Sequence, residues 1–319
     1  SIAFTNIVFL NENVISNQMF YTKYFYDQNW NIGFSEDTIE TLFVNKALGK
    51  VQWMKHNYHD RFFADPFILE TTEKTIILLA EEFIFAESKG KIVRLIIDKK
   101  DKKLLERIIV LDLDTHLSYP FIIRMNEQIF ICPENSQSGK VSLYLYDKNN
   151  HYATYYKTLI KEPLTDATIT FHKGKYWLIA TKQPYTQENA YLFFSDSLEG
   201  EYSLVNNAPI ITDKKSARPA GNFFYYQDKL YRPSQNSMTR YGSGISIQKI
   251  EMISENNYKE HTLFQIHPSS FEYNLGIHTI NFFENGCVID GCGYLYPLCG
   301  RILKYFIKIK NKITCQYLL

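Results

Sequence analysis

Charge of one sign is what this sequence most clearly lacks. Its 35 basic and 34 acidic residues give a formal net charge of +1. Proteins that bind nucleic acid or an anionic membrane surface normally carry a basic excess, and the composition offers none. No apolar run approaches the roughly 20 residues that a helix needs to cross a bilayer. We therefore expect neither a nucleic-acid partner nor a membrane span.

Cysteine, proline and glycine are also scarce. The 10 prolines and 14 glycines form no run that resembles a disordered linker. The five cysteines are odd in number and unevenly spread, so they do not indicate a disulfide framework. Cys287, Cys292 and Cys299 lie near one another in sequence but miss the spacing of paired zinc ligands. We expect free thiols, no zinc centre and a cytoplasmic location.

Aromatic residues are abundant instead. The 24 tyrosines and 23 phenylalanines help to bring the aromatic fraction to 16%, a bias that suits half-buried sheet surfaces. A chain of 319 residues is long enough for two average domains, but all-β barrels and propellers of this size often fold as one. The composition thus favours an all-β chain with a large core.

A short pattern recurs five times along the chain. In most copies a polar or charged residue opens an apolar, strand-like run. The copies begin at Asp65, Tyr119, Asp166, Arg218 and His278, at spacings of 54, 47, 52 and 60 residues. Self-similarity at this period is typical of a propeller or another repeat architecture.

Each copy continues with a polar turn, a second apolar run and a third. The turns contain Gly, Asp or Asn, which are hairpin residues. We expect a five-bladed β-propeller with about four antiparallel strands per blade. The fifth blade would take its third strand from Ile302–Lys310 and its last from Val51–Lys55. Residues 1–60 would then be a lead-in that closes the ring, and residues 61–319 the propeller. Two separate β-sandwiches are the alternative.

Inner strands of a propeller converge on its axis, so the five opening residues would form a ring at one mouth of the channel. The ends of the second strands would add Glu81 or Glu82, Glu134, Arg232 with Gln235, and Asp290. Glu81 and Glu82 are adjacent, so on a strand only one of them faces the mouth. Converging carboxyls are what glycosidic chemistry needs, because one protonates the departing oxygen while another activates water or attacks the sugar.

Several motifs resemble one family, the N-terminal-type domain of glucosamine inositolphosphorylceramide transferase, whose bacterial relatives are sometimes attached to formyltransferase-like domains. The motifs are Phe63-Ala64-Asp65-Pro66-Phe67, Ser118-Tyr119-Pro120-Phe121, Pro133-Glu134-Asn135-Ser136, Ser216-Ala217-Arg218-Pro219-Ala220-Gly221 and Tyr231-Arg232-Pro233-Ser234-Gln235-Asn236. They span nearly the whole chain. The resemblance implies a role in sugar metabolism and leaves the reaction open.

More distantly, the layout resembles the five-bladed furanosidase superfamily of arabinanases, xylosidases and levansucrases. That resemblance implies a general base at Asp65 and a carboxylate at Asp166 that tunes the acid. It places Arg218 where those enzymes carry their glutamate acid, and a guanidinium does not give up its proton near neutral pH. Glu134 and His278 are the replacement candidates. His278 also resembles a histidine that can hold a channel calcium.

These observations lead to one main hypothesis and two alternatives. We expect a glycosidase-like or glycosyl-transferring protein that acts on an anionic or phosphorylated sugar and needs no cofactor, apart from that calcium. The first alternative is a non-catalytic saccharide or nucleotide-sugar binding domain that serves a transferase, and the second is an interaction scaffold. The catalytic candidates are Asp65, Glu134, Asp166 and His278, and the substrate-binding candidates are Arg218, Arg232, Tyr119, Glu82, Gln235 and Arg240.

Overall fold

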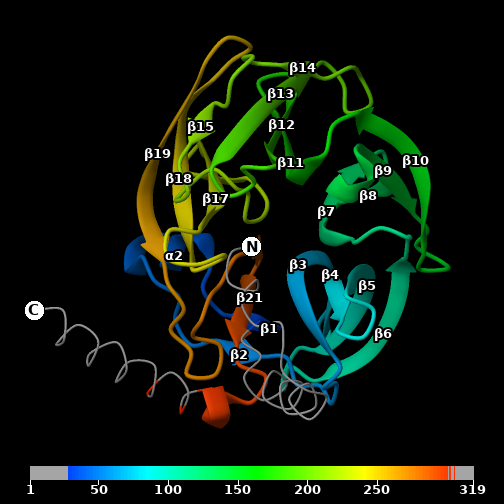
Figure 1. Cartoon of the computed structure of the whole chain (residues 1–319), viewed down its shortest axis with the longest axis vertical. Coiled ribbons are helices and arrows are strands. Elements are labelled where there is room, and N and C mark those ends of the chain that lie inside the picture. The colour runs from blue at the N-terminus through cyan, green and yellow to red at the C-terminus, as the bar shows by residue number, and fades with distance from the viewer. Residues whose placement is uncertain (1–27, 301, 303–304, 306–319) are drawn as a thin grey trace, which may run out of the picture.

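The protein is a five-bladed β-propeller, as the sequence predicts. The structure, a computed structural model, describes residues 28–300 together with Ile302 and Tyr305. Its strands form five antiparallel sheets, which stand around a central axis (Figure 1). Among the described residues, no helix is long and apolar enough to cross a bilayer.

The first two blades are regular four-stranded meanders in chain order. Blade 1 consists of β3 (Arg61–Thr71), β4 (Thr75–Ile84), β5 (Lys89–Asp98) and β6 (Leu104–Leu111). Blade 2 consists of β7 (Ser118–Met125), β8 (Gln128–Glu134), β9 (Val141–Tyr146) and β10 (Ala153–Ile160), with a 3-10 turn, η1 (Ser136–Ser138), between β8 and β9.

Blades 3 and 4 depart from this regularity at their edges. In blade 3 the outer strand is broken into two short pieces, both of which pair with β13. Blade 3 consists of β11 (Leu164–His172), β12 (Lys175–Lys182), β13 (Asn189–Ser195), β14 (Ser203–Leu204) and β15 (Ile211–Thr212). Blade 4 consists of β16 (Phe224–Tyr226), β17 (Lys229–Asn236), β18 (Gly244–Ile253) and β19 (Tyr258–Ile266).

The fifth blade closes the ring with strands from both ends of the described chain. Its sheet order is β20 (Ile280–Phe283), β21 (Gly286–Gly293), β1 (Asn29–Ser35) and β2 (Gln52–Trp53). A short helix, α2 (Ile39–Asn45), connects β1 to β2. Strand β1 pairs with β21 along its whole length. A strand from the N-terminal side of the described chain therefore completes the last blade and closes the ring.

The third strand of this blade is therefore a correction to the sequence prediction. We expected Ile302–Lys310 there, and β1 occupies the position instead. Ile302 and Tyr305 are helical, and the other residues of that range lie outside the described part of the chain. The expectation for the outer strand was right, since β2 falls inside Val51–Lys55.

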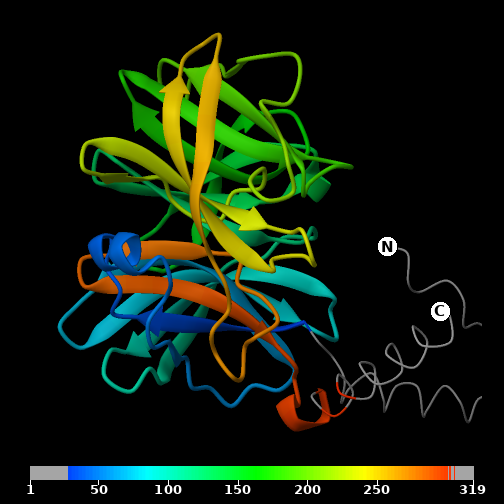
Figure 2. The same ribbon diagram turned by 90° about the vertical axis from the view of Figure 1, so that its left-hand side faces the viewer.

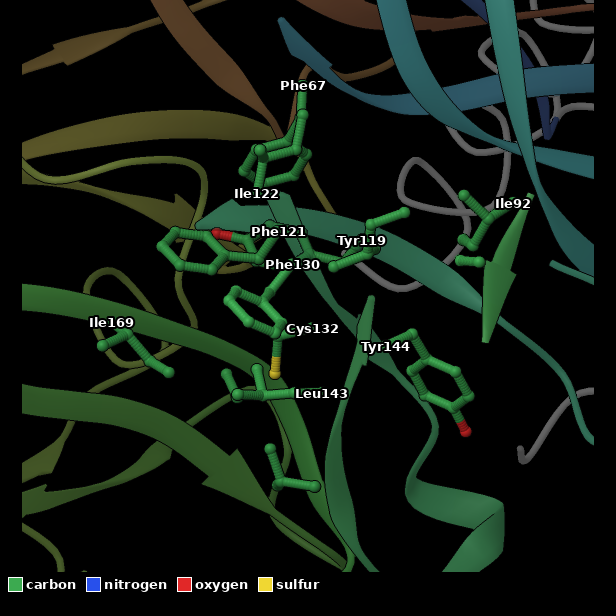
Figure 3. Packing of buried hydrophobic residues seen from close by; sticks show 14 of the residues in the cluster. Phe67, Ile92, Tyr119, Phe121, Ile122, Phe130, Cys132, Leu143, Tyr144 and Ile169 are labelled. Atoms are coloured by element: carbon green, nitrogen blue, oxygen red, sulfur yellow. The ribbon is translucent and has the colours of Figure 1, made fainter. Parts of the chain in front are cut away.

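The core lies between neighbouring blades, where the sheets face one another (Figure 2). One cluster joins blades 1, 2 and 3 through Phe67, Phe121, Phe130 and Leu178, and part of it is drawn in Figure 3. Further clusters lie between blades 5 and 1, 4 and 5, and 3 and 4. Fully burying one such aromatic or aliphatic side chain contributes about 1.5–3 kcal/mol, so these contacts fix the blades around the channel.

Close backbone approach also joins blades 4 and 5 beside the axis. The N–H of Ile280 donates to the carbonyl of Ala220 at 2.8 Å. Gly221 adopts φ +137°, and a Cβ there would lie 2.0 Å from the carbonyl oxygen of Ile280. Only glycine fits this position.

Candidate functional site

A pocket of about 340 Å³ opens at one end of the channel, and all five blades or their connections contribute to its lining. Its acidic residues are Asp65 and Glu81 from blade 1 and Glu134 from blade 2. Arg218 and His278 are the basic groups that precede the inner strands of blades 4 and 5. All five residues are largely buried, so their charges act in a medium that screens them weakly.

Three inner strands carry the same local distortion beside this pocket. Asp65, Tyr119 and Asp166 have φ values of 50°, 43° and 54°, and each sits at a register shift of β3, β7 or β11. A left-handed non-glycine residue is uncommon and costs energy, so its repetition marks a functional or strongly constrained position. Arg218 and His278, by contrast, lie before β16 and β20 rather than inside them.

Asp65 is held by donors from the two neighbouring blades. Its Oδ2 accepts the backbone N–H of Tyr119 at 3.1 Å, and its Oδ1 accepts the hydroxyl of Thr279 at 2.7 Å. Its own N–H donates to Asp290 at 3.1 Å. Burial raises the pKa of Asp65 to about 6, although the nearby His278 opposes the rise. The carboxyl is fixed in place and titrates close to neutrality.

His278 lies between two carboxylates. Its Nδ1 is 2.5 Å from Oδ2 of Asp290, and its Nε2 is 3.7 Å from Oδ1 of Asp65. The first contact is within ion-pair distance. Burial would lower the pKa of His278, but Asp290 and Asp65 outweigh it and the pKa is raised. An imidazolium in this position compensates the negative charge of both neighbours.

Arg218 is paired with Asp166 on the opposite side of the pocket. Its Nε–H donates to Oδ2 of Asp166 at 2.6 Å, and Gln235 donates to the same oxygen at 3.1 Å. Burial would lower the pKa of Arg218, but the Asp166 carboxylate raises it. Arg218 therefore stays charged and cannot act as an acid.

Glu134 and Glu81 have no cation of their own among the described contacts. Glu134 accepts the N–H of Ser136 at 3.1 Å, yet burial, reinforced by Asp166, raises its pKa to about 7. For Glu81 burial raises the pKa well above the ordinary value, and the charges of Asp65 and Glu134 add to the rise. Both carboxyls can hold a proton near neutral pH.

Aromatic rings form the walls of the pocket. Trp30 stacks on His278 with ring centres 4.0 Å apart, and Tyr241 lies edge-on to the same imidazole at 5.3 Å. The Tyr241 ring also lies 5.2 Å from the guanidinium carbon of Arg218. On the other side Phe62 and Phe83 stack at 4.9 Å. Apolar faces beside hydrogen-bonding groups suit the two kinds of surface of a sugar ring.

Four predicted site residues line this pocket: Asp65, Glu134, Arg218 and His278. Asp166, Gln235 and Tyr119 lie directly behind it. Asp166 and Gln235 hold Arg218. The Tyr119 hydroxyl accepts a hydrogen bond from the N–H of Gly221 at 2.7 Å and is hydrogen-bonded to the hydroxyl of Thr168 at 2.9 Å. This side chain therefore connects blade 2 to blades 3 and 4.

The remaining predicted residues are placed elsewhere. Glu82 faces away from the mouth and pairs with Arg61 and Arg107; its neighbour Glu81 faces the pocket instead. Arg232 is buried inside blade 4, where it pairs with Glu260 at 2.6 Å. Arg240 is half-buried in the loop beside Tyr241 and does not line the pocket. A ligand in this pocket would not meet these three groups.

Sequence reasoning missed the aromatic walls and His116. Trp30 comes from the ring-closing strand β1, Tyr241 from the β17–β18 loop, and His116 from the connection between blades 1 and 2. None of them belongs to the repeated pattern. The polar run of residues 234–243 is the feature of the sequence that could have pointed to the Tyr241 loop.

A calcium ion beside His278 does not fit these residues well. Asp65, His278 and Asp290 place ligand atoms within 4.8 Å of one another. Calcium prefers six to eight oxygen ligands, and this set offers two carboxyls and a nitrogen. Oδ1 of Asp290 already accepts the N–H groups of His278 and Thr279, at 2.8 and 3.0 Å. We therefore route no chemistry through a metal.

Known structures share this fold at very low sequence identity. The catalytic domain of the Coprinopsis cinerea GH62 alpha-L-arabinofuranosidase superposes with a TM-score of 0.54 at 9% identity, covering 82% of this chain and 85% of its own. A family 117 glycoside hydrolase from the marine bacterium Zobellia galactanivorans gives a TM-score of 0.51 at 9% identity, covering 85% and 91%. At this identity the likeness concerns the fold alone.

Comparison with related sequences identifies the family more specifically than the shared fold does. The chain is 35% identical over 158 residues to glucosamine inositolphosphorylceramide transferase 1 of Arabidopsis thaliana, which covers 48% of this chain and 21% of the relative. It is 32% identical over 211 residues to the protein of the same name from Oryza sativa subsp. japonica, covering 64% and 28%. The chain thus matches roughly a quarter of the length of these relatives. The profile of the family described as "Glucosamine inositolphosphorylceramide transferase 1, N-terminal" matches residues 35–274, and the chain belongs to that family.

Proposed function

We propose that this domain is carbohydrate-active and that the channel-mouth pocket binds a sugar whose glycosidic bond is cleaved or transferred there. The observation that carries the proposal is the set of buried carboxyls, Asp65, Glu81 and Glu134, between aromatic walls in one pocket. The name of the curated relatives, glucosamine inositolphosphorylceramide transferase 1, contains a sugar and supports a carbohydrate substrate.

Asp65 and Glu134 divide the chemistry between them. Ionised Asp65 takes a proton from water or from an acceptor hydroxyl, and that oxygen forms the new bond to the anomeric carbon. The bond to the departing oxygen breaks as Glu134 gives that oxygen its proton. Exchange with solvent then returns Asp65 and Glu134 to their starting states. As a nucleophile, Asp65 would instead bond to the anomeric carbon while the departing oxygen leaves with the proton of Glu134. Water or the acceptor hydroxyl, deprotonated by Glu134, would then displace Asp65 from the sugar. The negative charge of Asp166 helps to keep the proton on Glu134, and the positive charge of His278 stabilises ionised Asp65.

We extend the proposal to an anionic or phosphorylated sugar through Arg218. Asp166 uses the Nε–H of Arg218, so the two terminal amino groups are not used in that bond. A planar guanidinium pairs with phosphate or carboxylate in a bidentate manner. Because Asp166 compensates part of the charge, we expect the preference over neutral sugars to be moderate.

A non-catalytic saccharide or nucleotide-sugar binding domain is the second candidate. Arg218 favours this candidate. It stands where the five-bladed furanosidases that the layout resembles carry their general acid, and a guanidinium cannot release a proton near neutral pH. The share of the curated relatives that this chain matches, 21% to 28%, is compatible with a domain that presents a sugar to a transferase part.

The deciding experiment screens p-nitrophenyl glycosides, oligosaccharides and sugar nucleotides for product release and for binding heat. Asp65→Asn should lower turnover roughly a hundred- to ten-thousand-fold while binding persists, because the shape is kept and the base is lost. Asp60→Asn is the matched control, since Asp60 is 60% exposed and pairs with Arg61. Turnover that survives Asp65→Asn would end the mechanism. Binding without turnover in the wild type would select the second candidate.

A further inference from the structure

Among the described residues, the carboxyls around Glu81 outnumber the cations that could neutralise them. The pKa of Glu81 is raised by the charges of four neighbouring carboxyls, those of Asp65, Glu134, Asp166 and Asp290. Arg218 is paired with Asp166, and His278 lies between Asp65 and Asp290. A further ionised carboxyl in this buried group would have no counter-charge, and an unpaired buried charge is strongly unfavourable.

Within residues 28–300, His116 is the other basic side chain beside Glu81, and its hydrogen bond to Gly90 shows that it is neutral. Its Nδ1 lies 3.0 Å from the backbone nitrogen of Gly90. A backbone N–H can only donate, so Nδ1 must accept and carries no proton. The single ring proton is therefore on Nε2, which lies 3.5 Å from Oε1 of Glu81. His116 cannot supply a positive charge while this bond exists.

Gly90 makes the arrangement possible. A Cβ at this position would lie 2.6 Å from Oε1 of Glu81, 2.8 Å from Cε1 of His116 and 2.4 Å from the carbonyl oxygen of Leu117. The imidazole, the carboxyl and the β5 backbone are thus packed against one another at van der Waals limits. The position of the Glu81 carboxyl in the pocket wall is built into the fold.

We propose that Glu81 binds the sugar as a protonated carboxyl that donates a hydrogen bond to one of its oxygens, with neutral His116 as the positioning residue. This inference rests on the proposed function. It adds a side chain that contacts the sugar and the kind of hydrogen bond that it makes. The partner is an acceptor oxygen, such as a ring oxygen or a hydroxyl, because a protonated carboxyl offers one donor. The raised pKa of Glu81, caused first by burial and then by Asp65, agrees with this state.

The first test concerns the proton and needs no ligand. The infrared difference spectrum of wild type minus Glu81→Gln at pH 7 should contain the C=O band of a protonated carboxyl. Glu82→Gln is the matched control, because the adjacent Glu82 is fully buried between two arginines; its difference spectrum should contain carboxylate bands. If that variant does not fold, Glu87→Gln, which removes an exposed partner of Lys91, replaces it. Carboxylate bands alone for Glu81 would overturn the proposal.

Thermal unfolding gives an independent readout of the same proton. The pKa of Glu81 is higher in the folded state than its ordinary value near 4.5, so wild-type stability falls as pH rises from there toward the folded-state pKa. Glu81→Gln removes this titration. The Tm of Glu81→Gln minus the Tm of the wild type should therefore increase between pH 5 and pH 8, on the order of 2 °C per pH unit. A constant difference, or one that shrinks, contradicts a proton held by Glu81.

The second test concerns the sugar and uses the p-nitrophenyl glycoside that gives the largest binding heat. Glu81→Ala should weaken its affinity about ten-fold, and Glu81→Gln only about two-fold, because the amide still donates a hydrogen bond. Glu82→Gln should leave the affinity unchanged. Equal losses in both Glu81 variants would refute the hydrogen bond, while Asp65→Asn is judged separately on turnover. If no panel sugar binds, the proposed function and the contact with sugar fall together, and the infrared and thermal results still decide the protonation of Glu81.

Discussion

Two kinds of buried charge cluster occur in this propeller, one inside the blades and one at the channel mouth. Inside blade 4, Arg232 donates from Nε and Nη2 to the two oxygens of Glu260, at 2.7 and 2.6 Å. Inside blade 1, Glu82 meets both Arg61 and Arg107. At the mouth, the cations that the described part of the chain places beside the carboxyls are Arg218 and His278. The carboxyls there are Asp65, Glu81, Glu134, Asp166 and Asp290.

The difference separates a structural role from a functional one. A carboxylate that meets enough cations stays ionised and holds strands together. Carboxyls that exceed their cations retain protons near neutrality, as the raised pKa values of Glu134 and Glu81, caused first by burial, indicate. Groups poised in this way cluster at sites that move protons. Burial alone does not distinguish the two clusters; the balance of charge does.

Breaking a balanced cluster should have the largest effect on stability. Glu260→Gln would leave Arg232, whose side chain is 1% exposed, without its counter-charge, and we expect a loss of about 3–5 kcal/mol of unfolding free energy. Urea unfolding followed by fluorescence measures it. Sugar binding by the folded fraction should be unchanged, because neither residue lines the pocket.

A paired replacement provides the control for that change. Arg232→Met combined with Glu260→Leu removes both charges, and such apolar replacements are often close to neutral or stabilising. The double variant should recover most of the lost stability. A double variant no more stable than Glu260→Gln would mean that packing, and not the unpaired charge, explains the first result.

The paired arginine of the mouth should behave differently. Arg218→Lys keeps the charge but loses the planar fork, so affinity for a phosphorylated or carboxylated sugar should fall roughly ten- to a hundred-fold. Calorimetry with matched charged and neutral sugars measures the difference, and the neutral sugar should change less. Equal losses for both would show that Arg218 shapes the pocket without recognising a charge.

The sequence predicts the architecture of this protein better than its charge clusters. The five-fold pattern is local and repeats, so five blades follow from it. The third strand of blade 5 did not follow, because the strand β1 lies far from its partner β21 in sequence and only ring closure brings them together. An apolar run near the C-terminus was an equally plausible strand.

The site residues illustrate the same limit at the level of single side chains. Alternation along a strand established that only one of Glu81 and Glu82 could face the mouth, but the choice depends on the register in which Ala64 lies opposite Glu81. Arg232 could not be recognised as structural, because its partner Glu260 is on β19, a strand two positions away in the blade. Partners across a sheet are not visible in a local motif.

The pH dependence of glycoside cleavage tests most directly whether the unbalanced cluster at the mouth moves protons. Asp65 must be ionised to act and has a pKa raised to about 6 by burial. Glu134 must be protonated and has a pKa raised to about 7 by burial. Activity should therefore rise as pH increases through about 6, fall as it passes about 7, and form a narrow bell whose two apparent values belong to the coupled group. A rate that stays level from pH 5 to pH 9 would contradict the account.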